Sequence, residues 1–376
     1  MAYGHRWVEA ALKGTEVKHL GRGDADFRGM SYHGRADAVK KGTVFLNVFL
    51  YVLRNMRLAV SECGRPCEKV CDDDDDDCYL CDDAEAEAAG AWDRAVALYV
   101  GSLEGKEDES QFLYQLAETR CQNFGTCGWE GKDLTGTSNV NLRIMKEFTE
   151  GQQRLSGKGN GHCERVENHM SRIWKLMAVP MIQGTLRYAH KMDEKTTTEW
   201  DVSKEKAEKR NSEGATFAAA ILPRLWACNP DDAEVLYGNM RIGAVHTDFK
   251  TVKSIFEANY ECLGVTCVDV GGIIAPDTSD YFKWAMPCVE TGTSNLNAST
   301  RSQSGSGKTA GIVFGAIIGA VVALMALCFF YKRTQVMKSG KETPDMGNPD
   351  VFASEGARVT MPSIDGTDED NELCML

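Results

Sequence analysis

Five cysteines lie within nineteen residues of one another in the first quarter of the chain. They surround a run of aspartates from Asp72 to Asp77, and they are Cys63, Cys67, Cys71, Cys78 and Cys81. Zinc sites usually need a second well-spaced CxxC pair or nearby histidines, and this stretch offers neither. The aspartate run also lacks the alternating ligand spacing and the glycine of a calcium loop. We therefore predict disulfides and a solvated acidic linker rather than a metal site.

Other patterns that could carry chemistry are weaker. His162 and His169 stand seven residues apart and would share one helical face if a helix covers both. Such a pair is more often incidental than a metal site. The sequence has no GxSxG or HExxH motif and no phosphate-binding glycine loop after a strand. We therefore expect that the protein is not an enzyme.

The cysteine content points to an oxidising compartment. Of the fourteen cysteines, Cys328 lies in a long apolar run and Cys374 in the tail that follows it, which leaves an even number before the run. Outside the cell, such cysteines form disulfides by default. Two short separations predict local pairs, namely Cys121–Cys127 and Cys262–Cys267.

The apolar run itself predicts a membrane anchor. Residues 310–331 contain no charged side chain, and 22 helical residues span ~33 Å, enough for a bilayer core. Basic residues crowd the downstream end, which places the C-terminus in the cytoplasm. We expect a single-pass type I protein of the plasma membrane whose tail could meet the endocytic machinery and carry it to endosomal vesicles. Gly311, Gly315 and Gly319 would let two such helices approach as a homodimer.

Composition and periodicity predict the rest of the organisation. A net charge of −13 argues against a nucleic-acid partner. Trp92, Val96 and Tyr99 form an apolar stripe, and further helices are expected up to residue 260, with Pro180 separating or kinking two of them and Asp231 and Asp248 as N-caps. The fold class is mainly α, a helical extracellular domain with disulfides plus one C-terminal transmembrane helix.

The expected segments follow in chain order. The apolar stretch 44–60 is too short for a second span and predicts a buried helix. The boundaries are 1–62, unassigned and read as the remnant of a preceding lobe; 63–90, a Cys/Asp-rich linker; 91–290, the helical domain; 291–309, a Ser/Thr/Gly stalk with a glycosylation sequon at Asn297; 310–331, the membrane helix; and 332–376, an acidic cytosolic tail.

Four segments, in order, resemble a known family. They are WDRAVALYVGSLEG (92–105), LAETRCQNFGTC (116–127), VPMIQGTLRYA (179–189) and EGATFAAAILPRLWACN (213–229). Together they resemble the Fe-assimilating proteins of green algae and the iron-starvation-induced phytotransferrins of diatoms. The resemblance implies cell-surface capture of ferric iron, with carbonate as synergistic anion, followed by internalisation. The chain departs from the pattern in showing one lobe rather than two and in having no apolar leader at its start.

The matching segments contain oxygen ligands suited to a hard cation such as ferric iron. Tyr188 stands beside Arg187, a pairing that suits a phenolate ligand and a carbonate held by a guanidinium. Further candidate metal ligands, all in family-like segments, are Glu213, Asp93, Tyr99 and Glu104. Asp93 and Glu104 are three helical turns apart, so one metal would bind both only if the helix bends, and Tyr99 also fits a core position.

Two other functions remain open at this point. One is a cell-surface adhesion or structural glycoprotein that binds no metal. The other is a helical extracellular enzyme of unknown chemistry. Metal analysis of the purified protein separates the iron-binding function from the first alternative.

Overall fold

The structure is a computed structural model that describes residues 2–19, 22–63, 79–101, 112–155, 162–197, 202–244, 246–276 and 279–289, with residues 2, 79–85 and 162 as backbone only. The predicted stalk, membrane helix and tail lie outside the described residues, as do Asn297, Glu104 and most of the cysteine- and aspartate-rich linker.

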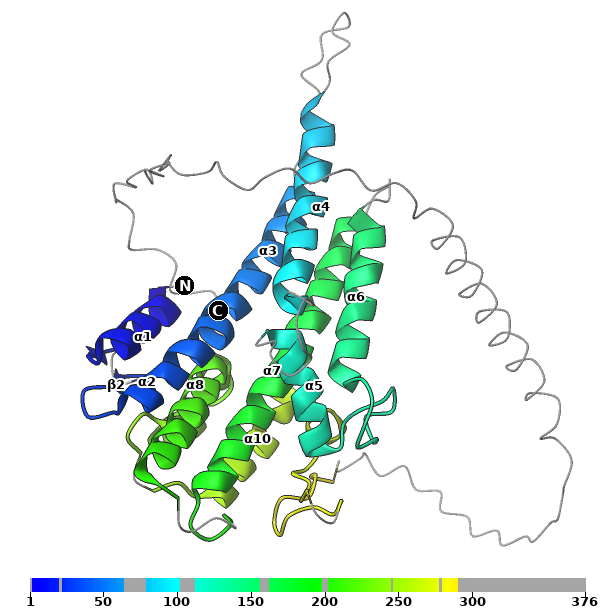
Figure 1. Cartoon of the computed structure of the whole chain (residues 1–376). Coiled ribbons are helices and arrows are strands. Elements are labelled where there is room, and N and C mark those ends of the chain that lie inside the picture. The colour runs from blue at the N-terminus through cyan, green and yellow to red at the C-terminus, as the bar shows by residue number, and fades with distance from the viewer. Residues whose placement is uncertain are drawn as a thin grey trace, which may run out of the picture. The chain divides into compact units, whose positions relative to one another are not determined.

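The described part of the chain is mainly helical, which confirms the predicted fold class at that level (Figure 1). The helices are α1 (Ala2–Lys13), α2 (Tyr32–Gly42), the π-helix η1 (Thr43–Val48), α3 (Phe49–Cys63), α4 (Tyr79–Val100), α5 (Leu113–Phe124), α6 (Asn139–Leu155), α7 (His162–Met192), α8 (Lys204–Cys228), α9 (Pro230–Met240), α10 (Phe249–Leu263) and α11 (Cys267–Val270). Two short strands, β1 (Glu16–Val17) and β2 (Ala25–Asp26), pair antiparallel.

Helix α7 is the element against which most of the others pack. It contacts α3, α5, α6, α8 and α10, and Figure 1 shows it running beside α6. Pro180 was expected to separate or kink two helices, and it does not separate them, because α7 is one helix of 31 residues with Pro180 inside it. The residues around Pro180 are buried among the neighbouring helices, and this tertiary packing offsets the missing backbone donor.

Residues 2–63 belong to the same compact unit as the later helices. Helix α2 packs on α8, and α3 packs on α4. A second buried cluster joins the two regions, since Trp7, Phe27 and Ala38 pack with Ala215 and Ala219 of α8. The expected boundary at 63–90 therefore does not separate two compact units among the described residues.

Side-chain caps begin several helices. Ser203 accepts from the Lys206 N–H at the start of α8, and Asp248 accepts from the Thr251 N–H at the start of α10, which confirms the predicted Asp248 cap. The predicted Asp231 cap is wrong. Asn229 caps α9 instead, because Pro230 occupies the first helical position and the Asn229 side chain reaches the Asp231 and Asp232 N–H groups.

Four disulfides lie among the described residues, and they are Cys63–Cys163, Cys121–Cys127, Cys228–Cys262 and Cys267–Cys288. The predicted Cys121–Cys127 pair is confirmed. The predicted Cys262–Cys267 pair is wrong. Cys262, near the end of α10, pairs with Cys228 at the end of α8, and Cys267 pairs with Cys288 in the segment that follows α11.

One helical stretch in the described part, Tyr32–Cys63, is long and apolar enough to cross a membrane by length and composition alone. It comprises α2, η1 and α3. Phe45, Phe49, Val52 and Met56 are buried in the main core, as the sequence predicted for 44–60. The stretch therefore contributes one wall of the helical core.

Candidate functional site

Tyr188 of α7 and Glu213 of α8 meet where these two helices pack together. The Tyr188 ring stacks on Phe217 of α8, with ring centroids 5.9 Å apart and an interplanar angle of 16°. Gly214 permits this approach, because a Cβ at that position would lie 2.9 Å from the Tyr188 Cβ. Tyr188 is 8% exposed, so its phenol stands at the edge of the core rather than on the open surface.

The Tyr188 phenol is held in its neutral form. Burial raises the pKa of Tyr188 well above its ordinary value, and the negative charge of the Glu213 carboxylate raises it further. The nearby Arg120 and Arg187 guanidinium groups oppose this shift. A free phenolate is therefore disfavoured, and only a strong cation next to the oxygen would displace the proton.

Arg120 of α5 lies beside the stacked rings of Tyr188 and Phe217. Its side chain is buried, at 5% exposure, and its guanidinium carbon is 5.8 Å from the Tyr188 ring centre and 5.2 Å from that of Phe217. Nη1 donates to Asn123 Oδ1 at 3.1 Å, but Nε is buried with no hydrogen-bond partner among the described residues. A buried guanidinium N–H without an acceptor is rare and costly, so the Arg120 Nε–H is a donor suited to an added acceptor.

More basic side chains lie near Tyr188 and Glu213. Burial lowers the pKa of Arg187, and the Arg120 charge lowers it further. Burial, Arg187 and Arg210 lower the pKa of Lys191 to about 8. Burial also lowers the pKa of Lys41, although Glu213 counteracts this effect. These shifts show that the cations interact with one another in a poorly solvated environment.

Carboxylates are fewer than cations in this cluster. Lys41 Nζ lies 3.6 Å from Glu213 Oε1, and Lys209 lies 3.6 Å from Asp37. Burial and the Glu213 charge raise the pKa of Asp37. We name this group the α7/α8 cluster and define it by its residues, which are Asp37, Lys41, Arg120, Arg187, Tyr188, Lys191, Arg210 and Glu213. Its positive balance suits a multivalent oxyanion.

The other predicted ligands do not join this cluster. Asp93 lies on the exposed side of α4 and accepts from Gln152 Nε2 at 2.8 Å. The Tyr99 hydroxyl is buried and donates to Asn141 Oδ1 at 2.6 Å, and the Tyr99 ring packs near the rings of Tyr114 and Phe148. Burial, followed by Tyr114 and Glu118, raises the pKa of Tyr99 well above its ordinary value. Tyr188, Glu213 and Arg187 are thus the predicted residues that come together.

The sequence did not single out Arg120, Lys41 or Lys191 as site residues. Arg120 stands inside the LAETRCQNFGTC segment, but an arginine in a helical segment is usually solvated. Its burial depends on α5 packing against α7, a contact that the sequence pattern does not reveal. Lys191 follows Tyr188 by three positions on α7, so helical spacing could have indicated that it shares the same face.

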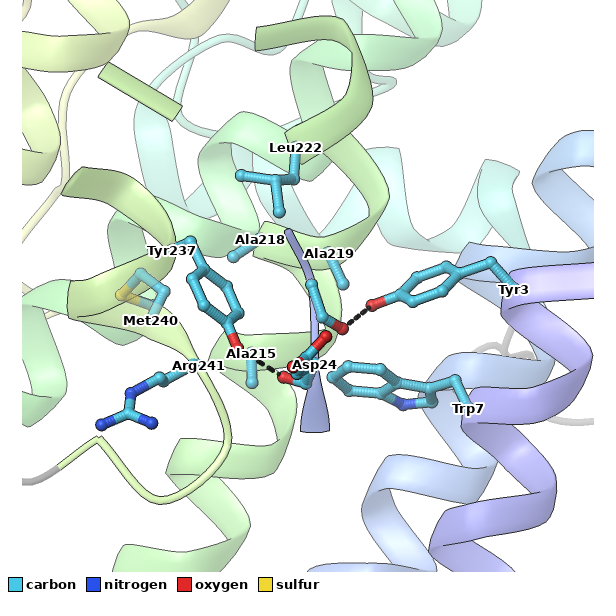
Figure 2. A pocket seen from close by; sticks show the side chains of 11 residues that line it. Tyr3, Trp7, Asp24, Ala215, Ala218, Ala219, Leu222, Tyr237, Met240 and Arg241 are labelled. Carbon is cyan, nitrogen blue, oxygen red and sulfur yellow. Dashed lines mark hydrogen bonds between the residues drawn. The ribbon is translucent and has the colours of Figure 1, made fainter. Parts of the chain in front are cut away.

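A small cavity near the N-terminus offers no comparable chemistry. Figure 2 shows the Tyr3 and Tyr237 rings on opposite sides of Asp24. Their hydroxyls already donate to the Gly23 and Asp24 carbonyls, at 2.7 and 2.8 Å. The enclosed space of ≈ 10 Å³ is about that of one water molecule. This cavity is therefore a packing feature between the N-terminal segment, α8 and α9.

Comparison with family models, curated proteins and solved structures gave no match for this chain. The comparisons therefore show no family for this chain.

Proposed function

We propose that this protein captures ferric iron at the cell surface, together with carbonate as synergistic anion, for uptake by internalisation. Tyr188 and Glu213 would supply the protein's oxygen ligands, and Arg120 and Arg187 would hold the carbonate. The observation that carries the proposal is a buried phenol next to a partly buried carboxylate, among basic side chains that outnumber the carboxylates. The four resembling segments contribute each of these residues except the basic side chains of α2, Lys191 and Arg210.

The charges explain why metal and anion would bind together. Ferric iron alone would be repelled by Lys41, Arg120, Arg187 and Lys191, and carbonate alone would face the Glu213 carboxylate. Carbonate between the guanidinium groups and the metal satisfies both, because it is a hard oxygen donor that accepts hydrogen bonds in a fork. The buried Nε of Arg120, which lacks an acceptor among the described residues, would gain one.

The proposed location follows from the sequence. Residues 310–331 would anchor the chain in the plasma membrane with type I topology, and the tail would engage the endocytic machinery. In an acidified endosomal vesicle, protonation of carbonate and competition for the phenolate would release the iron.

A titration of the purified full-length protein in detergent tests the proposal. Ferric iron is supplied as a weak chelate, with and without bicarbonate, and bound iron is counted by elemental analysis after desalting. We expect binding that requires bicarbonate, is lost in Arg120→Gln and is kept in Arg57→Gln, a matched change on the exposed side of α3. The proposed site would be rejected if the amount of bound iron changed neither with bicarbonate nor in Arg120→Gln.

A second candidate, oxyanion binding without a metal, is favoured by the same positive balance. Under this alternative, bicarbonate or phosphate would bind to the iron-free protein, and Tyr188→Phe would leave that binding unchanged. In the titration, no iron would then remain bound to the protein after desalting.

A further inference from the structure

A second group of metal-ligating side chains lies between α6 and α7, away from Tyr188. Glu147 and Glu150 are one turn apart on α6, and His169 stands opposite them on α7. One ligand atom from each of the three residues lies within 4.8 Å of the other two. His169 is 6% exposed, so it is an inward-facing member of the group, whereas Glu147 and Glu150 are partly buried.

The ring nitrogen of His169 has two contacts that it cannot satisfy together. Nδ1 lies 2.6 Å from Glu147 Oε2, which can only accept a hydrogen bond when ionised, and 2.9 Å from Arg172 Nη2, which can only donate one. A protonated Nδ1 suits Glu147 and opposes Arg172, while an unprotonated Nδ1 suits Arg172 and opposes Glu147. A cation without protons, in place of the guanidinium, would accept electron pairs from both Nδ1 and Glu147.

Glu147 is already paired with a cation, the Arg172 guanidinium. Arg172 Nε donates to Glu147 Oε2 at 2.7 Å. The Arg172 guanidinium thus contacts two of the three ligand atoms, and its side chain is 48% exposed, so it can move into solvent without unpacking the core.

We propose that Glu147, Glu150 and His169 bind a divalent transition metal, for which Arg172 is the competing internal cation. One imidazole and two carboxylates suit borderline ions such as Zn²⁺ and Co²⁺ and leave coordination positions open for water. Metal–ligand bonds of about 2.0–2.2 Å place ligand atoms up to about 4.4 Å apart, so small rotamer changes close the site. Lys146, 3.9 Å from Glu150, is an exposed cation that the metal would also displace.

Co²⁺ absorption and competition with Zn²⁺, in full-length protein purified in detergent, test this site directly. His169→Gln and Glu147→Gln should weaken the binding by more than about 100-fold, since removal of an outer partner alone costs about 10–100-fold. Arg172→Gln removes the competitor and should tighten binding by about tenfold or more. Glu167→Gln, an exposed change on the same helix, is the matched control and should leave binding unchanged.

Two results would overturn the proposal. One is a folded Arg172→Gln protein whose affinity for Co²⁺ is no higher than that of the unmodified chain. The other is a His169→Gln protein that binds Co²⁺ as the unmodified chain does. Circular dichroism and the unfolding midpoint of each variant report whether it is folded. Tyr188→Phe should leave the Co²⁺ signal intact, so failure here is distinguishable from failure of the proposed ferric site.

Discussion

The Arg120 guanidinium carbon lies 5.8 Å from the centre of the Tyr188 ring, so a buried cation of α5 stands beside the phenol of α7. Cation–π attraction of about 0.5–2 kcal/mol offsets only part of the cost of burying an arginine. No carboxylate among the described residues forms an ion pair with Arg120. This relationship links stability to the proposed anion site, because an anion bound beside Arg120 would offset the cost of burying its charge.

Arg120→Met should therefore separate stability from binding. Methionine keeps the packing volume against Tyr188 and Phe217 and removes the buried charge. Without bicarbonate, the free energy of unfolding should stay the same or rise by about 1 kcal/mol or more. Bicarbonate-dependent stabilisation should disappear. Denaturant unfolding with and without bicarbonate measures both effects, and a marked loss of stability in the anion-free protein would mean that Arg120 is a structural residue.

His190 should make the protein less stable in mild acid. It is buried between Phe249 and Phe282, and burial lowers its pKa to about 4, whereas a free histidine has a pKa of about 6.5. Between these values the unfolded state binds more protons, so stability falls as the pH drops from about 6.5 to about 4. The full loss is about 3 kcal/mol.

Denaturant unfolding across this pH range gives the measurement. His190→Phe should flatten the profile relative to the unmodified chain, whereas His246→Phe, an exposed change, should not. Equal slopes in all three proteins would show that His190 does not control the acid response.

The disulfides should contribute unequally to stability. Cys63–Cys163 closes a loop of 100 residues, and Cys121–Cys127 closes one of 6. Chain entropy alone predicts a loss of about 4–5 kcal/mol for the double serine variant of the first pair and about 2 kcal/mol for the second. Denaturant unfolding ranks the two variants, and peptide mapping without reduction should also recover Cys228–Cys262 and Cys267–Cys288. A mapped Cys262–Cys267 peptide would contradict the fold.

Alanine substitutions at two helical glycines should change the stability of the protein in opposite directions. A Cβ at Gly151 of α6 would lie 2.2 Å from Trp92 Cζ2 of α4, so Gly151→Ala should cost roughly 1–3 kcal/mol. Gly238 of α9 has nothing within 4 Å of such a Cβ, and Gly238→Ala should stabilise by roughly 0.5–1 kcal/mol. Thermal unfolding of both variants checks the α4–α6 contact, and a harmless Gly151→Ala would show that these helices do not meet this closely.

The sequence predicted local features better than long-range ones. The apolar period around Trp92 and Tyr99 and the Asp248 cap depend on neighbouring residues, and both appear in the structure. The partner of Cys262 could not be deduced, because 34 residues separate it from Cys228 and only the packing of α8 against α10 brings them together. The same limit applies to Pro180, whose helix is continuous because its surroundings are buried.

In the candidate site, too, the sequence predicted local features but not contacts between distant segments. Arg187 and Tyr188 are neighbours in the sequence, and the segments that carry the resemblance contain both of them and Glu213. The approach of Arg120 and Lys41 depends on α5 and α2 packing against α7 and α8, which no local pattern in the sequence specifies. The sequence paired His169 with His162, whereas its partners in the structure, Glu147 and Glu150, belong to another helix.

The most direct test of the central claim is the absorption of the iron-loaded protein with Tyr188 and with Tyr188→Phe. The change keeps the ring that stacks on Phe217 and removes only the oxygen. Since the neutral phenol must lose its proton to the metal, the unmodified chain should release a proton on binding ferric iron and show a tyrosinate–iron charge-transfer band. With matched bicarbonate, Tyr188→Phe should lose the band and most of the iron affinity while its unfolding midpoint changes little. An unchanged band and affinity in Tyr188→Phe would contradict the account.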